Sequence, residues 1–482
     1  MAECDGINDS RNDAVNKKVY WEEIAMRRKD ADMTQGVIWK QFVAFSVPMA
    51  IGLLFQQLYN TVDTLVVGRF VGKEALAAVG STGSIINMMV GLCAGLSTGA
   101  SVVISQTYGA HDHKRLHDAV HTTISVTFIL CLLATAAGLL LIDPMLAMMD
   151  TPEDVLPDAR AYLTIYFAGM TGLLIYNMGS GILRAVGDSR RPLYFLVFSA
   201  IINTVFDLVF VVYFDMGVRG VAVATILAQG LSALLVLATL TREQGSYGIR
   251  WRELGISLRE LKQILGIGMP SAVQQGITSF SNVFVQSYIN AFGSACMAGY
   301  SSYSKLDAFI LIPVQSIALA STTFVGQNWG AKQPERARQG VRQALVISLI
   351  ATVSLTLGML CFAHPLMSLF SSDEEVIDYG VRFLTLVTPF YFTICFNQIY
   401  GGALRGVGNA KAPMIIMLSS FVVFRQLYLL VTRLLHLGFV SVALAYPMGW
   451  LLCSTLLIIC YRRSVLFRQA KEPVQEKNSA AA

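Results

Sequence analysis

The chain has 482 residues, of which 54% are hydrophobic and only 14% are charged, and its formal net charge is +5. Because a soluble domain carries about 25% charged residues, this composition excludes a water-exposed surface over the whole chain and predicts an all-α membrane protein. It also gives no basic domain of the kind that binds nucleic acid. No Walker A, GxSxG or HExxH motif occurs, so we expect neither an ATP-driven pump nor an enzyme, and no cofactor.

The predicted elements begin after a polar segment, residues 1–37, in which we expect no signal peptide because no apolar stretch precedes a cleavage-like site. Twelve apolar runs follow, each long enough to cross a hydrocarbon core of about 30 Å as a helix. Inside lipid every backbone N–H and C=O must be bonded within its own segment, which favours helices over strands. The predicted spans are 40–68, 76–107, 117–142, 157–183, 192–214, 217–240, 263–290, 296–328, 339–363, 376–403, 413–435 and 438–460.

The loops between these spans alternate in charge. One set carries Lys and Arg, for example Lys114 and Arg115 after the second span, whereas the alternate set carries acidic patches at 150–154 and 373–375. Because basic loops stay in the cytoplasm, we expect both termini there, in a multi-pass protein of the inner or plasma membrane. Twelve is an even number of spans, as this orientation requires.

The two halves of the chain repeat. One constant shift of 221 residues superimposes Gly72 on Gly293, Gln106 on Gln327, Leu183 on Leu404, Pro192 on Pro413 and Gly217 on Gly438. Six spans per unit is an even number, so the sequence predicts parallel repeats: two pseudo-symmetric six-helix lobes with substrate bound between them. The expected organisation, in a monomer, is an N-terminal segment 1–37, a first lobe 38–241, a linker 242–262, a second lobe 263–464 and a tail 465–482.

One repeated motif, LRxVG followed by a proline, occurs at 183–192 and again at 404–413. Its glycine suits a tight turn and its proline can begin the next helix. We therefore interpret the motif as turn chemistry rather than as a direct part of transport.

Two carboxylates in the first half form the sharpest candidate site, because a charge inside a membrane is costly and is a functional hypothesis by default. Asp63 lies late in the first span, and Asp207 lies in the fifth span one turn after Asn203. At 1.5 Å per residue, Asp207 is roughly 22 Å above the start of its helix and Thr225 roughly 12 Å below the outer end of the sixth span. All four can therefore meet at one level. They could supply oxygen ligands to Na⁺, or the two acids could hold a proton; the alternative is a structural pair of neutral acids. No other metal site is expected.

The repeat makes this candidate site asymmetric. The same shift maps Asn203 onto Phe424, Asp207 onto Tyr428, Thr225 onto Tyr446, and Asp63 onto Phe284 or Val285. The second half lacks these polar groups, so the ion site is predicted to belong to the first half alone.

The second half carries charges of its own. Lys305 and Asp307 in the eighth span and Arg425 in the eleventh could pair within the second lobe, either structurally or in a substrate or coupling role. Pro48 and Pro270 lie early in the first and seventh spans, where a proline removes a helix hydrogen bond. The bend at Pro48 could couple to the ion site or be a static kink.

Together these features resemble the multidrug and toxic compound extrusion family, with the prokaryotic branch as the nearest likeness. The resemblance covers about residues 38–464 and rests on Pro48 and Asp63 in the run ending QQLYNTVD, on Asn203–x(3)–Asp207, on Thr225 and on the repeated LRxVG turn. It implies a V-shaped cavity between two lobes, export of amphipathic organic cations against Na⁺ or H⁺, and cation binding by the residues matching Asp63, Asn203, Asp207 and Thr225. Another branch carries an acidic residue in helix seven, whereas no residue from Gln263 to Ser304 is acidic here.

The predicted function is therefore secondary active multidrug efflux of organic cations by alternating access, in membrane lipid, with Na⁺ or H⁺ as the coupling ion. A first alternative is a flippase for a lipid-linked oligosaccharide or related amphiphile, which should have a cationic cavity. A second alternative is a non-transporting membrane receptor or scaffold, which should have a sizeable soluble or partner domain.

Overall fold

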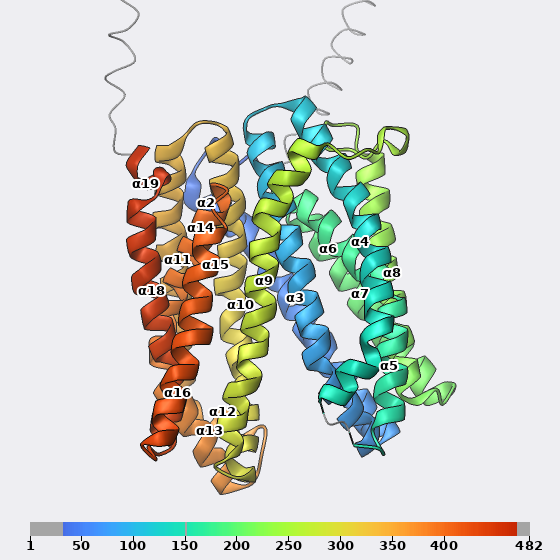
Figure 1. Cartoon of the computed structure of the whole chain (residues 1–482), viewed down its shortest axis with the longest axis vertical. Coiled ribbons are helices and arrows are strands. Elements are labelled where there is room, and N and C mark those ends of the chain that lie inside the picture. The colour runs from blue at the N-terminus through green and yellow to red at the C-terminus, as the bar shows by residue number, and fades with distance from the viewer. Residues whose placement is uncertain (1–31, 150–151, 470–482) are drawn as a thin grey trace, which may run out of the picture.

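The computed structural model describes residues 32–149 and 152–469, and the regular elements of these residues are all helices (Figure 1). The predicted all-α fold is confirmed. Residues 1–31 of the predicted N-terminal segment, Asp150 of the first acidic patch and residues 470–482 of the predicted tail lie outside the described residues.

The first lobe is built from six membrane-crossing helical units. In chain order they are α2 (Ile38–Val66) continued by the π-helical η1 (Val67–Val71), α3 (Lys73–Gly109), α4 (His113–Met148), α5 (Leu156–Ala168) with α6 (Met170–Ala185), α7 (Arg190–Leu208) continued by the π-helical η2 (Val209–Tyr213), and α8 (Gly217–Arg242). The segment joining the lobes contains the short η3 (Trp251–Glu253). It is shorter than predicted, because the next helix begins at Leu258.

The second lobe repeats the plan. Its elements are α9 (Leu258–Asn290), α10 (Ser294–Gly330), α11 (Pro334–Cys361) with α12 (Ala363–Ser368), α13 (Glu374–Val387) with η4 (Thr388–Phe390) and α14 (Tyr391–Gly406), α15 (Lys411–Leu418) with η5 (Ser419–Phe424) and α16 (Arg425–Leu434), and α17 (Phe439–Ala443) with α18 (Ala445–Arg463), followed by α19 (Val465–Gln469). Ten of the described helices are long and apolar enough to cross a membrane by length and composition. The two other predicted spans are α5 with α6, interrupted at Gly169, and α9, which glutamines and serines make more polar.

The duplication predicted from the sequence recurs in the backbone. Helices α3 and α10 begin and end 221 positions apart, and most of the residues with positive φ recur at the same shift. These pairs are His111 (φ 53°) with Lys332 (φ 56°), Asp215 (φ 53°) with His436 (φ 50°), and Gly187 (φ 95°) with Gly408 (φ 92°). Because few residues other than glycine adopt a positive φ, the recurrence of two non-glycine pairs at one shift confirms the two pseudo-symmetric lobes.

The two lobes meet closely at the end of the molecule where α2 begins and α19 ends, which we call the terminal end (upper part of Figure 1). Here α3 crosses α10 with backbones almost in contact. A Cβ atom at Gly109 would lie 1.9 Å from the carbonyl oxygen of Gln327, and one at Gly330 would lie 1.9 Å from that of Gln106. Only glycine fits at either place, so this repeated glycine allows the lobes to close.

Hydrogen bonds related by the repeat seal the same end. Gln106 Nε2 donates to the carbonyl oxygen of Gly406 at 2.7 Å, and Gln327 Nε2 donates to that of Ala185 at 2.8 Å. Gln106 of the first lobe thus bonds the end of α14, and Gln327 of the second lobe bonds the end of α6.

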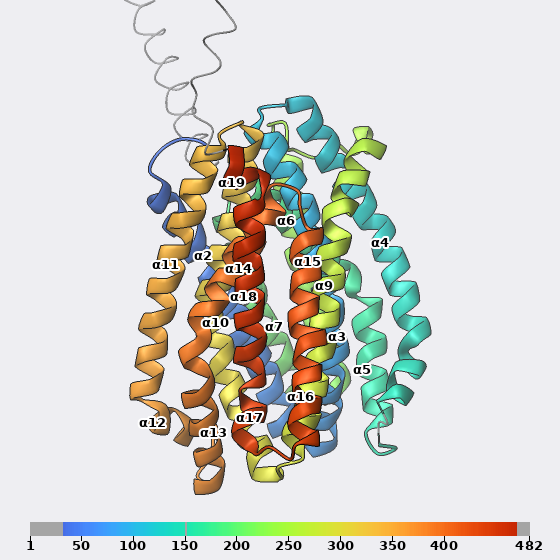
Figure 2. The ribbon, with the colours of Figure 1, turned by 60° about the vertical axis from the view of Figure 1, so that its left-hand side comes forward.

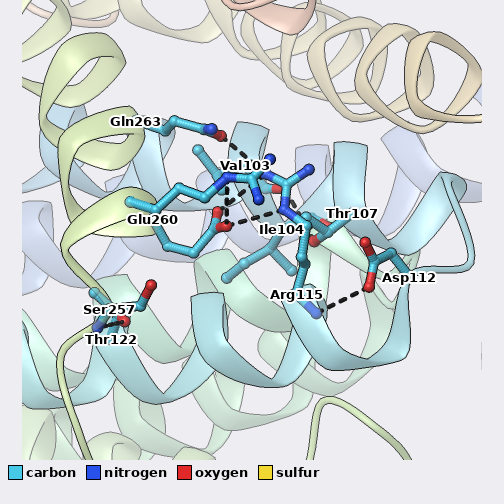
Figure 3. A network of polar contacts seen from close by, with 10 residues as sticks. Val103, Ile104, Thr107, Asp112, Arg115, Thr122, Ser257, Glu260 and Gln263 are labelled. Atoms are coloured by element: carbon cyan, nitrogen blue, oxygen red, sulfur yellow. Dashed lines mark hydrogen bonds and ion pairs between the residues drawn. The ribbon is translucent and has the colours of Figure 1, made fainter.

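Two arginine contacts, also related by the repeat, hold the lobes together nearby. Arg115 of α4 makes a two-pronged ion pair with Glu260 of α9, at 3.0 and 3.3 Å, and also donates to Gln263 Oε1 at 3.3 Å (Figure 3). Its counterpart Arg336 of α11 donates to Gln41 Oε1 of α2 at 3.0 Å. We call these the two arginine clasps.

Toward the opposite end the lobes separate. There α5 of the first lobe lies far from α12 and α13 of the second in Figure 1, and α5 makes no substantial packing contact with either of them. Figure 2, turned by 60°, shows that the long helices nevertheless run roughly along one common axis. The molecule is therefore closed at the terminal end and divided into two lobes at the opposite end.

Candidate ion and substrate sites

The structure brings Asp63 and Asp207 together inside the first lobe. Helix α7 packs against both α2 and α8, and it places the carboxyl groups of Asp63 and Asp207 near enough to interact electrostatically. Asp207 is fully buried and Asp63 is 8% exposed. Two carboxylates at such range repel each other unless a proton or a cation lies between them.

Asn203 and Thr225 are also buried in this lobe. The Thr225 hydroxyl donates to the carbonyl oxygen of Val221 at 2.9 Å, which leaves its own oxygen able to accept or to coordinate. All four predicted residues are thus buried on neighbouring helices of one lobe.

The polar atoms of this group have no donor or acceptor partner among the described residues. The unpaired atoms are Asp63 Oδ1, both carboxyl oxygens of Asp207, and both amide atoms of Asn203. Buried polar atoms are nearly always paired in proteins, because leaving one unpaired costs about 1–3 kcal/mol. Several such atoms in one place, most of them oxygens, suit a small hard cation or a proton with water.

Both acids are followed by irregular helix. The π-helical η1 begins four residues after Asp63, and the backbone N–H of Val67 bonds the Asp63 carbonyl oxygen; η2 begins two residues after Asp207. Such π-helical insertions occur frequently at functional sites. No sequence pattern predicted these two insertions.

A cavity of about 460 Å³ lies between the lobes, lined by α2, α3, α6, α7 and α8 of the first lobe and by α9, α10 and α14 of the second. Asn203 and Thr225 line it, whereas Asp63 and Asp207 do not. Pro48, inside α2, lines it as well, whereas Pro270, inside α9, does not although the next residue does. The two prolines predicted to matter for conformation thus lie at or beside this cavity.

The charge of the cavity differs from the acidic lining that an organic-cation carrier suggests. Of the described residues that line it, only Arg184 and Arg405 are charged. They are the arginines of the two LRxVG motifs. The turn interpretation holds for Gly187 and Gly408, which have positive φ, but it missed the arginines. Their occurrence at matching places in both halves was the available signal.

The predicted Lys305–Asp307–Arg425 ion-pair network is absent from the described residues, and this prediction was wrong. Lys305 is exposed with its ammonium 5.7 Å from the centre of the Phe370 ring. Asp307 instead accepts a hydrogen bond from the hydroxyl of Tyr391. Residues two apart on a helix point in different directions, so Lys305 and Asp307 face different surroundings.

Arg425 is buried, at 3% exposure, and one of its terminal nitrogens is bonded to neutral groups, whereas its Nε has no partner among the described residues. It donates to Ser281 Oγ at 2.9 Å and to Asn282 Oδ1 at 2.8 Å, and it lies 5.1 Å from the centre of the Tyr446 ring. The hydroxyl of Tyr446 is 2.6 Å from that of Tyr300. Aromatic and hydroxyl groups therefore fill this part of the second lobe.

Comparisons with known proteins agree with this geometry. The family model MatE matches residues 48–209 and 270–429, which is one match in each lobe. The chain is 28% identical over 441 residues to the probable multidrug resistance protein YpnP of Bacillus subtilis, covering 90% of this chain and 97% of the relative. It is 26% identical to a protein of Shewanella oneidensis named FAD transporter, covering 80% and 86%. Its fold matches a solved structure described as the outward-facing conformation of a multidrug resistance MATE family transporter of the MOP superfamily, with a TM-score of 0.86 and 25% identity, covering 92% of this chain and 99% of the other.

Proposed function

The chain belongs to the MatE family of multidrug efflux transporters, and from this premise we propose that it is a secondary active exporter that moves an amphipathic organic molecule outward in exchange for entering Na⁺ or H⁺. The terminal end then faces the cytoplasm, as the basic loops predict. Organic cations were the cargo predicted from the sequence, but the cavity lining offers them no carboxylate among the described residues.

The observation that carries the proposal is the buried pair Asp63 and Asp207, three of whose four carboxyl oxygens are buried without a protein donor. An entering cation or proton relieves the repulsion between the two acids, so its binding has a large differential effect on this lobe. Asn203 and Thr225 belong both to this group and to the cavity lining. A change at the ion site therefore reaches the substrate site through shared residues.

The closed terminal end and the separated opposite end support an alternating-access cycle in which this structure is the outward-facing form. Ion binding from outside rearranges α2 and α7 at the acids, and the cargo is released from the cavity. The arginine clasps and the hydrogen bonds of Gln106 and Gln327 between the lobes must then break for the lobes to open toward the cytoplasm. Each entering monovalent cation contributes about 2.3 kcal/mol per 100 mV, about a 50-fold bias.

The test is uptake of fluorescent amphiphiles into inverted membrane vesicles, with and without an imposed Na⁺ or H⁺ gradient. Ethidium serves as the cationic probe and riboflavin 5′-phosphate as the anionic one. We expect gradient-driven accumulation of at least one probe, and its loss in Asp63→Asn and Asp207→Asn. The matched control is Asp215→Asn, which changes an exposed acid of the same lobe at a left-handed position that asparagine tolerates. Ion coupling would be contradicted if each probe accumulated to the same level with and without an imposed Na⁺ or H⁺ gradient.

The flippase alternative keeps one supporting observation, because its expected cationic cavity agrees with Arg184 and Arg405. A cavity of about 460 Å³ suits a drug-sized molecule better than a lipid-linked oligosaccharide. The name of the Shewanella oneidensis relative, FAD transporter, also supports a small anionic cargo.

A further inference from the structure

We propose that the cavity binds the anionic group of its cargo, a phosphate or carboxylate on an amphipathic organic molecule, between Arg184 of the first lobe and Arg405 of the second. This inference rests on the proposed function, since it names the cargo of the same carrier. It replaces the organic cation expected from the sequence with an organic anion.

The first step concerns the lack of partners. Arg184 and Arg405 lie in the last turns of α6 and α14, and both line the cavity. Neither guanidinium makes a hydrogen bond or an ion pair with any described residue, whereas the buried Arg425 is bonded to Ser281 and Asn282. Both arginines are half-buried, and a partly desolvated arginine without a counter-charge favours the binding of an anion.

A purely structural role in capping the helix ends is less well supported. Cations do stabilise helix C-termini by bonding the last carbonyl groups. Here the carbonyl oxygens that follow the two arginines, those of Ala185 and Gly406, already accept hydrogen bonds from Gln327 and Gln106. The arginine side chains make no such bond among the described residues.

The remaining lining fits an amphipathic anion. Amide side chains from both lobes supply neutral donors and acceptors: Gln56, Gln229, Gln274, Gln275, Gln315 and Gln398. Among them, Gln229 Oε1 and Gln274 Oε1 are buried without a partner. Leucines of α2, α6, α7 and α10 cover other parts of the wall. The cavity therefore offers two fixed positive charges, hydrogen-bonding amides and an apolar surface for the body of the cargo.

The position of the arginines links cargo charge to closure. Each arginine directly precedes the residue whose carbonyl oxygen the other lobe's glutamine bonds, so the pair lies beside the seal of the terminal end. An anion held by one arginine from each lobe stabilises the closed terminal end, because it joins the lobes across the repeat axis. Its release toward the opposite end removes that link.

The charge of the cargo also changes the electrical balance of the exchange. A cationic cargo leaving for one entering cation moves no net charge. A monovalent anion leaving for one entering cation moves two charges in the same electrical sense, each biased about 50-fold per 100 mV. The exchange of an anion is then driven about 2,500-fold by a potential of 100 mV, negative inside.

The test uses the purified full chain and two flavins that differ only in a phosphate, riboflavin 5′-phosphate and riboflavin, with binding read from flavin fluorescence. We expect the wild-type chain to bind the phosphate at least tenfold more tightly. Arg184→Gln and Arg405→Gln should each weaken phosphate binding by about tenfold to one hundredfold and leave riboflavin unchanged. Arg184→Lys should restore much of the preference. The matched controls Arg242→Gln and Arg463→Gln remove exposed arginines from the last turns of α8 and α18 and should change nothing.

Two outcomes would overturn the proposal: equal affinity of the wild-type chain for both flavins, or a phosphate preference that survives in the double glutamine variant.

An added arm measures translocation of fluorescent phosphatidylglycerol in proteoliposomes. If the arginine variants abolish this lipid movement and spare riboflavin 5′-phosphate, the anion is a lipid headgroup and the proposal is wrong. In proteoliposomes an imposed potential should drive uptake of riboflavin 5′-phosphate more strongly than that of riboflavin, which carries no charge of its own. Ion coupling is read separately: loss of gradient dependence with the phosphate preference intact would refute the antiport and not this site.

Discussion

The two lobes share one backbone plan but differ in chemistry at the same level of the membrane. In the first lobe, both carboxyl oxygens of Asp207 are buried without partners, and the Thr225 hydroxyl donates only to its own helix. In the second lobe, the residues at the matching positions are Tyr428 and Tyr446, and the neighbouring Arg425 and Tyr300 make hydroxyl, amide and ring contacts. The first lobe therefore has unpaired polar groups near Asp207 that can bind a ligand, whereas aromatic and arginine side chains occupy the matching place in the second lobe.

This difference shows how the two halves of a duplicated fold can take different functions. Closure at the terminal end is symmetric, because matching glycines, glutamines and arginines act from both lobes. The cavity is lined by one arginine from each repeat. Only the group around Asp63 and Asp207 lacks a counterpart, so ion coupling is assigned to the first lobe while cargo binding and closure use both.

The largest effect should come from making the first lobe resemble the second at Asp207. Asp207→Asn or Asp207→Tyr removes one of the two acids, so we expect gradient-driven accumulation to fall by about the 50-fold that one ion supplies per 100 mV. The measurement is probe uptake into inverted vesicles under an imposed gradient. Asp215→Asn is the control, and full accumulation in Asp207→Tyr would break the comparison between the lobes.

A smaller effect, on stability rather than coupling, is expected in the second lobe. Arg425→Gln loses the hydrogen bonds to Ser281 and Asn282 and the contact with the Tyr446 ring, which should cost about 1–3 kcal/mol of unfolding free energy. Thermal unfolding in detergent measures this, with Arg433→Gln, an exposed position of the same helix, as the control. Loss of ion dependence in Arg425→Gln with unchanged stability would assign the arginine to coupling instead.

Tyr391→Phe should have a still smaller effect. It removes a donor to Asp307, but Tyr303 also contacts this acid and can donate to it. We expect a loss of about 1 kcal/mol of stability and unchanged ion coupling. The exposed Tyr213→Phe is the control in the same unfolding assay, and a variant as unstable as Arg425→Gln would show that Asp307 depends on Tyr391 alone.

The smallest effect is expected at the arginine clasps, of which only the one made by Arg115 includes an acid, Glu260. Glu260→Gln weakens the Arg115 clasp and should shift the equilibrium toward the form open at the terminal end by about fivefold or less. Distances between spin labels at Asp154 and Asp373, at the opposite end, would report the shift. The exposed Glu335→Gln should leave the distances unchanged, and an equal shift in both variants would exclude a specific role for Glu260.

Much of this arrangement could be predicted because it depends on local pattern. Apolar length predicted twelve spans, and the constant shift predicted the repeat that recurs in His111 and Lys332. Helical rise predicted that Asp63 and Asp207 could meet. The pairing of Lys305 with Asp307 failed because the direction of each side chain depends on the surrounding helices. Arg184 was missed for a related reason, since only packing of both lobes reveals the cavity that it lines.

The most direct test of the central claim is ion binding to the purified chain, measured as bound ²²Na⁺ and as protons released or taken up in the same sample. The account predicts saturable binding of one of the two ions that is lost in Asp207→Asn and retained in Asp307→Asn. Binding that persists in Asp207→Asn and disappears in Asp307→Asn would contradict it, because the coupling site would then lie in the second lobe.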